Sequence, residues 1–133
     1  MRRFELPFAL IHSIEDSILE IVFCEAIEID MDMVTKLHKV LESFCTNEVC
    51  ILVNNINEFN YSFEAQMNIF DLEKIVAVSF VCYTKNSHRA VEAMLNLPRK
   101  NEPNAKIFYE YREGIEWLEQ QFVDVNNSLI NST

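Results

Sequence analysis

Glycine is almost absent from this chain, since Gly114 is its only one in 133 residues. Loops that cradle phosphate need several glycines, because backbone N–H groups must approach the anion closely. A single glycine therefore excludes a P-loop and a dinucleotide-binding turn, and it also excludes the G-x-S-x-G turn of the α/β-hydrolases. We accordingly expect no cofactor, no catalytic residues and a protein that is not an enzyme.

Positive charge and long apolar runs are also scarce. The chain has 11 Lys and Arg against 21 Asp and Glu, a formal charge of −10, which argues against nucleic acid or an anionic membrane surface as a partner. The longest uncharged stretch, Ile75–Thr84, is too short to cross a bilayer, so no membrane insertion is expected. The first residues make a poor signal peptide, and a cytoplasmic location is expected.

The cysteines and histidines show no metal-binding spacing. There is no C-x-x-C, and the four cysteines, Cys24, Cys45, Cys50 and Cys82, are interpreted as free structural thiols. The histidines, His12, His38 and His88, are far apart in the sequence. An acidic run, Glu25, Glu28, Asp30 and Asp32, could hold a cation, but a solvated edge strand followed by a helix cap is the favoured interpretation. No metal site is predicted.

Half of the residues are hydrophobic, and their spacing predicts alternating strands and helices. A hairpin is expected from Phe8–Ile14 and Ile18–Phe23, followed by a short run at Ala26–Ile29. Further strands are expected at Val49–Val53, Ile75–Tyr83 and Ala105–Tyr109. Helices are expected from Asp30 to Phe44, from Ser62 to about Phe70, after Ser87, and over Glu113–Phe122. Asp30, Ser62 and Ser87 are the predicted N-caps of the first three. This order predicts an α/β fold, a single mixed β-sheet of four to five strands flanked by about four helices. We expect one domain over residues 1–123 and a flexible polar tail over 124–133.

Residues 8 to 120 resemble the STAS/SpoIIAA-like proteins, in particular their small uncharacterised bacterial members. The resemblance rests on the hairpin, on the strand that ends at Val53-Asn54-Asn55, on the Val76–Val81 strand, and on the closing segment Glu113-Gly114-Ile115-Glu116-Trp117-Leu118. It implies a mixed sheet with packed helices. The Asp-Ser-(small)-Gly motif that is phosphorylated in the anti-sigma-factor antagonists of this family is missing here.

The loop after the central strand is the candidate binding surface, because open α/β sheets tend to bind at the carboxyl ends of their strands. Its candidate partner-binding residues are Asn54, Asn55, Glu58, Phe59, Tyr61 and Ser62, with Phe59 and Tyr61 as aromatic anchors. A phosphate on Ser62 would sit favourably at a helix N-terminus. The alternative is an ordinary turn in which Ser62 only caps the helix.

Two functions are therefore expected in order of preference. The first is a non-enzymatic interaction or regulatory module that binds another protein, with self-association as a homodimer left open. The second is a carrier of a small apolar (lipid-like) ligand between sheet and helices. Much of the scarce positive charge lies close together in the sequence, and it could bind an acidic partner or a second copy of the chain. The residues are Lys85, Arg89, Arg99, Lys100 and Lys106.

Overall fold

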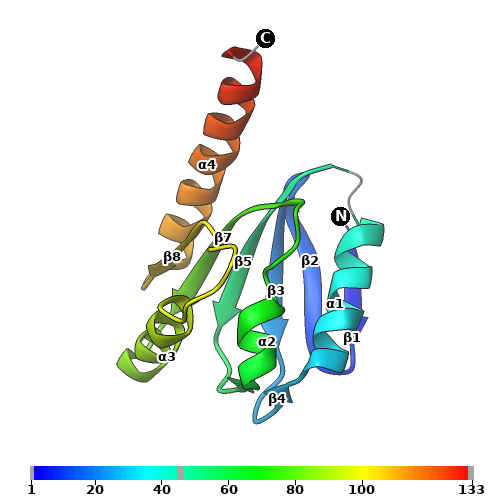
Figure 1. The fold of residues 1–133 in the computed structure, drawn as a ribbon, viewed down its shortest axis with the longest axis vertical. Helices are drawn as coiled ribbons and strands as arrows, with labels where there is room; N and C mark the ends of the chain where they lie inside the picture. The colour runs from blue at the N-terminus through cyan, green and yellow to red at the C-terminus, as the bar shows by residue number, and fades with distance from the viewer. Residues whose placement is uncertain (1, 45–46, 132–133) are drawn as a thin grey trace.

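The computed structural model describes residues 2–44 and 47–131 and has a central six-stranded sheet (Figure 1). The strand order is β1 (Arg3–Leu6), β2 (Ala9–Glu15), β3 (Ile18–Phe23), β5 (Val49–Asn55), β7 (Ile75–Cys82) and β8 (Ala105–Phe108). The first two pairings are antiparallel and the other three are parallel. The predicted mixed α/β sheet is thus confirmed, with six strands in place of the expected four to five.

Two short strands outside the main sheet pair with each other. They are β4 (Glu28–Ile29) and β6 (Asn60–Tyr61), which run parallel. The run expected at Ala26–Ile29 is therefore a strand only at its end. Ala26 itself adopts a left-handed backbone conformation with a φ of 60°, which residues with a β-carbon rarely occupy.

Three helices cover one face of the sheet and the fourth covers part of the other (Figure 1). On the first face lie α1 (Met31–Phe44), α2 (Phe63–Asn68) and α3 (Lys85–Leu95), which contribute Leu37, Ala65 and Val91 to the main core. On the second face, α4 (Tyr111–Asn131) packs Leu118 against the central strands. Because both faces are covered, β3, β5 and β7 are almost entirely apolar, as parallel strands usually are.

The helix boundaries follow their capping residues. Asp30 accepts a hydrogen bond from the backbone N–H of Met33 at 3.0 Å, so the predicted cap of α1 is confirmed. Ser62 caps α2 as predicted, by accepting from the backbone N–H of Ala65 at 3.1 Å. The cap expected at Ser87 was wrong, because Thr84 accepts from the backbone N–H of Ser87 and α3 begins at Lys85.

Helix α4 continues well past the expected end at Phe122 and extends beyond the sheet (Figure 1). Its start lies close against the sheet because Gly114 has no side chain. A β-carbon there would lie 3.1 Å from Cγ2 of Val81, and the Ser79 hydroxyl donates to the Gly114 carbonyl at 2.8 Å. The flexibility expected of residues 124–133 stays a prediction.

Candidate functional site

The loop after β5 is a fixed structure, tied to the connection between β3 and β4. The backbone N–H of Ala26 donates to the Glu58 carbonyl at 2.7 Å, and the N–H of Glu58 donates to the Glu25 carboxylate at 3.0 Å. The side-chain amide of Asn57 donates to the Phe23 carbonyl at 2.8 Å. With the β4–β6 pairing, these bonds hold the loop as a wall at the carboxyl ends of the parallel strands.

A cleft of about 900 Å³ lies between this wall and α3. From the loop side it is lined by Asn55, Ile56 and Tyr61 among others, and from the helix side by Ser87, Val91 and Met94. Glu25, Glu28 and Glu58 also line it, whereas none of the described lining residues is a lysine, arginine or histidine. The cleft is therefore negatively charged, with a mixed polar and apolar wall.

The structure divides the six candidate residues of the loop. Asn55, Glu58, Phe59 and Tyr61 line the cleft, whereas Asn54 and Ser62 do not. Phe59 and Tyr61 are half-buried, because their rings pack on Phe23 with centroids 4.9 and 5.9 Å away. Ser62 is engaged in capping α2, a helix of only six residues.

The exposed apolar side chains beside the cleft are Ile56 and Tyr83, which are 59% and 46% exposed. Neither is among the residues that the sequence singled out. Tyr83 could have been found by the same argument as the Asn54–Ser62 loop, because it directly follows the carboxyl end of β7.

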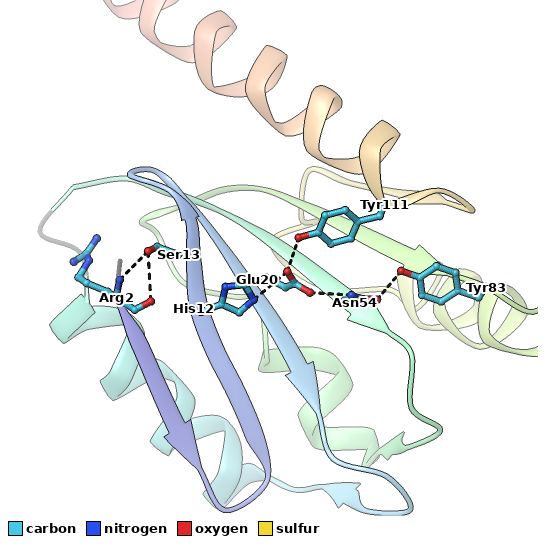
Figure 2. Close-up of polar contacts among 7 residues, drawn as sticks. All are labelled: Arg2, His12, Ser13, Glu20, Asn54, Tyr83 and Tyr111. Atoms are coloured by element: carbon cyan, nitrogen blue, oxygen red, sulfur yellow. Dashed lines mark hydrogen bonds and ion pairs between the residues drawn. The ribbon is translucent and has the colours of Figure 1, made fainter.

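On the other face of the sheet, a buried carboxylate organises a chain of polar contacts (Figure 2). Glu20 is only 5% exposed and lies 3.1 Å from Nε2 of His12. It accepts from the amide of Asn54 at 2.8 Å and from the hydroxyl of Tyr111 at 2.5 Å. Asn54 in turn accepts from the Tyr83 hydroxyl at 2.8 Å. These partners satisfy a charge that would be costly to bury alone.

This chain of contacts links four elements of the fold. His12 lies on β2, Glu20 on β3, Asn54 on β5 and Tyr111 in the first turn of α4. Tyr83 connects it to the cleft, which its side chain also lines. Burial raises the pKa of both tyrosines, and the neighbouring Glu20 carboxylate raises each further, so both hydroxyls stay protonated donors.

Sequence reasoning missed Glu20, although one signal was available. It is the only charged residue in the apolar run Ile18–Phe23, and a charge in a strand covered on both faces needs partners. The partners themselves come from distant positions and could not be read from spacing.

The Tyr61 hydroxyl is buried and has no hydrogen-bond partner among the described residues. Burial, followed by the nearby Cys82, raises the pKa of this hydroxyl far above its ordinary value. The sulfur of Cys82 accepts a hydrogen bond from the side-chain amide of Asn55 at 3.4 Å. The buried groups beside the cleft therefore include a thiol and an amide as well as the Tyr61 hydroxyl.

The remaining candidates are placed as follows. Cys50 and Cys82 are buried and Cys24 is half-buried, all as free thiols, and burial raises the pKa of Cys50 to about 11; Cys45 lies outside the described residues. His38 bonds to the Ile69 carbonyl at 2.8 Å, and His88 stacks on Tyr109 with centroids 5.0 Å apart. Within residues 2–44 and 47–131, no three histidines, cysteines or carboxylates are grouped as metal ligands would be.

Comparison with solved structures identifies this architecture. An uncharacterised protein of the DUF3478 family from Shewanella loihica PV-4, described as having a SpoIIAA-like fold, superposes with a TM-score of 0.56. The match covers 83% of this chain and 91% of that one, at 14% sequence identity. The chain has a SpoIIAA-like fold. The resemblance seen in the sequence is thereby confirmed for the fold, which by itself does not assign a function.

No protein-family model and no curated protein matches the sequence. The fold consists of a sheet with helices on both faces. The part of the chain that the structure describes contains no helix that is both long and apolar enough to span a membrane.

Proposed function

We propose that this chain is a non-enzymatic protein-interaction module, and that the cleft between the Asn54–Ser62 loop and α3 is its partner-binding surface. The observation that carries the proposal is the cleft itself, whose hydrogen-bonded wall presents exposed Ile56 above a half-buried aromatic cluster and which exposed Tyr83 also lines. Exposed apolar side chains on an ordered surface, with charged groups around them, are typical of protein-binding surfaces.

The charge of the cleft indicates which partner it suits. Its three glutamates, Glu25, Glu28 and Glu58, favour a segment that carries lysine or arginine beside apolar residues. The pair that most resembles acid–base machinery, Glu20 and His12, does not line this cleft and is engaged with Tyr111 and Asn54. This separation supports a binding role over catalysis.

The proposal is tested by comparing two matched variants in quantitative pull-downs from a native extract. Ile56→Asp places a negative charge on the wall of the cleft. Val123→Asp places the same charge on α4, where Val123 is 49% exposed. We expect a defined set of proteins to be lost with Ile56→Asp and retained with Val123→Asp. If both variants recover the same proteins as the original chain, the cleft is not the partner-binding surface.

A small-ligand carrier is the second candidate, because the volume of the cleft lies within the range of ligand pockets. Val91 and Met94 would supply apolar contact, and the unpaired Tyr61 hydroxyl would supply a polar one after a small movement of the wall. Native mass spectrometry of the purified chain decides this point. A retained adduct that Val91→Asp removes supports the carrier, and a bare protein mass of 15.6 kDa contradicts it.

A further inference from the structure

The segment that contains α3 and β8 is a basic region in an acidic protein. Between Thr84 and Phe108 the chain has five lysine and arginine residues and two glutamates, a local charge of +3, whereas the whole chain has a formal charge of −10. Lys85, Arg89, Lys100 and Lys106 are exposed. None of these four forms an ion pair with another of the described residues. The ammonium of Lys106 lies over the Phe108 ring, 5.5 Å from its centroid, a contact that does not neutralise its charge. The four charges can therefore still meet an external partner.

The same region contains an open edge of the sheet. Strand β8 ends the strand order, and no other strand of the described residues pairs with its outer side. The backbone N–H of Val78 donates to the Asn104 carbonyl, and Lys106 is the register partner of Ser79. Because parallel strands alternate the direction of their backbone groups, those of Ala105 and Ile107 point away from β7.

Cations lie on both faces of this part of the sheet. Lys106 is paired in register with Ser79, whose hydroxyl bonds to α4, so it lies on the face that α4 covers. On the opposite face α3 packs beside β8 (Figure 1), and its solvent-exposed side carries Lys85 and Arg89, one helical turn apart. His88 stacks on Tyr109 and thereby fixes the start of α3 next to the end of β8, and Tyr109 is itself 56% exposed.

We propose that the outer edge of β8 is a second docking site, which takes an extended acidic segment of another protein as an added strand. The backbone groups of Ala105 and Ile107 would pair with the segment. Its alternate side chains would point to the two faces, where carboxylates would meet Lys106 on one side and Arg89 on the other. This surface is separate from the cleft and opposite to it in charge.

A second copy of this chain fits the edge poorly. Pairing β8 with β8 of another copy would bring Lys106 against its equivalent, and like charges across an interface are unfavourable. Pairing β8 with the other open edge, β1, would place it beside Arg3 and Glu5, which already form an ion pair at 3.1 Å and offer Lys106 no net negative charge. An acidic segment from a different protein would bring carboxylates that are not already paired.

The test uses a fluorescein-labelled octapeptide of the repeat Glu-Glu-Thr-Thr, which places carboxylates on both faces of an added strand. It is titrated with the full chain and followed by fluorescence anisotropy. Arg89→Glu/Lys106→Glu is expected to weaken binding by roughly tenfold or more. Lys36→Glu/Lys39→Glu changes the net charge equally at two exposed positions of α1 and is expected to weaken binding less than about twofold. Equal weakening by both double variants would overturn the proposal, because it would mean that the peptide responds to the net charge of the protein and not to the β8 edge.

A second measurement leaves the protein unchanged. The same peptide, N-methylated at every residue so that neither of its edges can donate to a strand, is expected to lose binding. Amide exchange at Ala105 and Ile107 is expected to slow only with the parent peptide. The proposal fails if the methylated peptide binds as well as its parent, if the parent does not bind at low salt, or if protection appears at Ile56 in the cleft. A dimer by light scattering that Lys106→Glu dissociates would also overturn it, since the edge would then serve self-association.

Discussion

The hydroxyl of Tyr111 donates a 2.5 Å hydrogen bond to Glu20, which lies 91 positions earlier in the chain. This bond joins the first turn of α4 to the middle of β3, where Glu20 also accepts from Asn54 and lies beside His12. Docking of α4 on the sheet therefore depends on a buried polar contact as well as on the apolar packing around Leu118.

Tyr111→Phe is expected to lower the free energy of unfolding by about 1.5 kcal/mol, because it removes a hydrogen bond to a charged, buried acceptor. Amide exchange in α4 is expected to accelerate more than exchange in α1. Tyr109→Phe is the matched control, since the Tyr109 hydroxyl has no hydrogen-bond partner among the described residues. An equal loss of stability in both variants, measured by urea unfolding, would contradict a specific role for the Tyr111–Glu20 bond.

Ala26→Gly is expected to raise the free energy of unfolding by about 0.5 kcal/mol. The left-handed backbone of Ala26 costs about 1 kcal/mol in a residue with a β-carbon, and the greater freedom of glycine in the unfolded chain offsets part of the gain. Ala93→Gly, in the exposed part of α3, is the same substitution in a helix and is expected to lower stability by about 1 kcal/mol. Destabilisation by both changes would argue against strain at Ala26.

Tyr61→Phe is expected to leave stability unchanged or to raise it by up to about 1 kcal/mol, because it removes a buried hydroxyl that has no hydrogen-bond partner within residues 2–44 and 47–131. The packing of the ring against Phe23 and Phe59 is retained in this variant. Thermal unfolding of the purified chain measures the effect. A loss of more than about 1 kcal/mol would mean that an internal water or a ligand satisfies the hydroxyl.

The contact between Glu15 on β2 and Glu119 on α4 is expected to make the free energy of unfolding slightly dependent on pH. Hydrogen bonding with Glu119, followed by burial and charge repulsion, raises the pKa of Glu15 above its ordinary value of 4.5. A raised carboxyl pKa in the folded state stabilises the fold at low pH, and that stability is lost as the pH rises through the raised pKa of Glu15. Because both groups are exposed, the effect is only about a few tenths of a kcal/mol.

Glu119→Gln is expected to flatten this pH dependence of the free energy of unfolding, measured by urea denaturation across the titration of Glu15. Glu113→Gln removes the same charge from an exposed position near the start of α4 and is expected to leave the slope unchanged. If Glu119→Gln leaves the slope as it was, Glu15 and Glu119 do not interact in solution.

Local patterns in the sequence predicted those elements whose apolar residues recur at a regular spacing. The β2–β3 hairpin, β5, β7 and α1 belong to this group, because each has its own periodic or continuous apolar run. Strands β1 and β6 were missed, since they have four and two residues and only their pairing, with β2 and β4 respectively, defines them. Thr84 and Ser87 are both good N-cap residues, so the sequence alone does not choose between them. In the structure β7 ends at Cys82 and α3 begins at Lys85, which makes Thr84 the cap.

The loop selected from the sequence lines the cleft, but the side chains that it exposes there differ from those expected. The rule that parallel strands bind at their carboxyl ends placed it at the loop after β5, where the cleft lies. The rule does not say which way a side chain points, and the rings of Phe59 and Tyr61 pack on Phe23 while Ile56 is exposed. The partners of Glu20 come from β2, β5 and α4, and only the folded chain brings them together.

The only glycine of the chain lies in α4 where the helix meets the sheet, so none is left for a loop or a turn. Every connection is therefore built from residues with side chains, which restrict the backbone of the unfolded ensemble as well as that of the native state. Fewer conformations are then lost when each connection becomes ordered, and this lowers the entropic cost of folding. Replacing loop residues by glycine, other than at Ala26, is thus expected to destabilise the protein even where no native contact is removed.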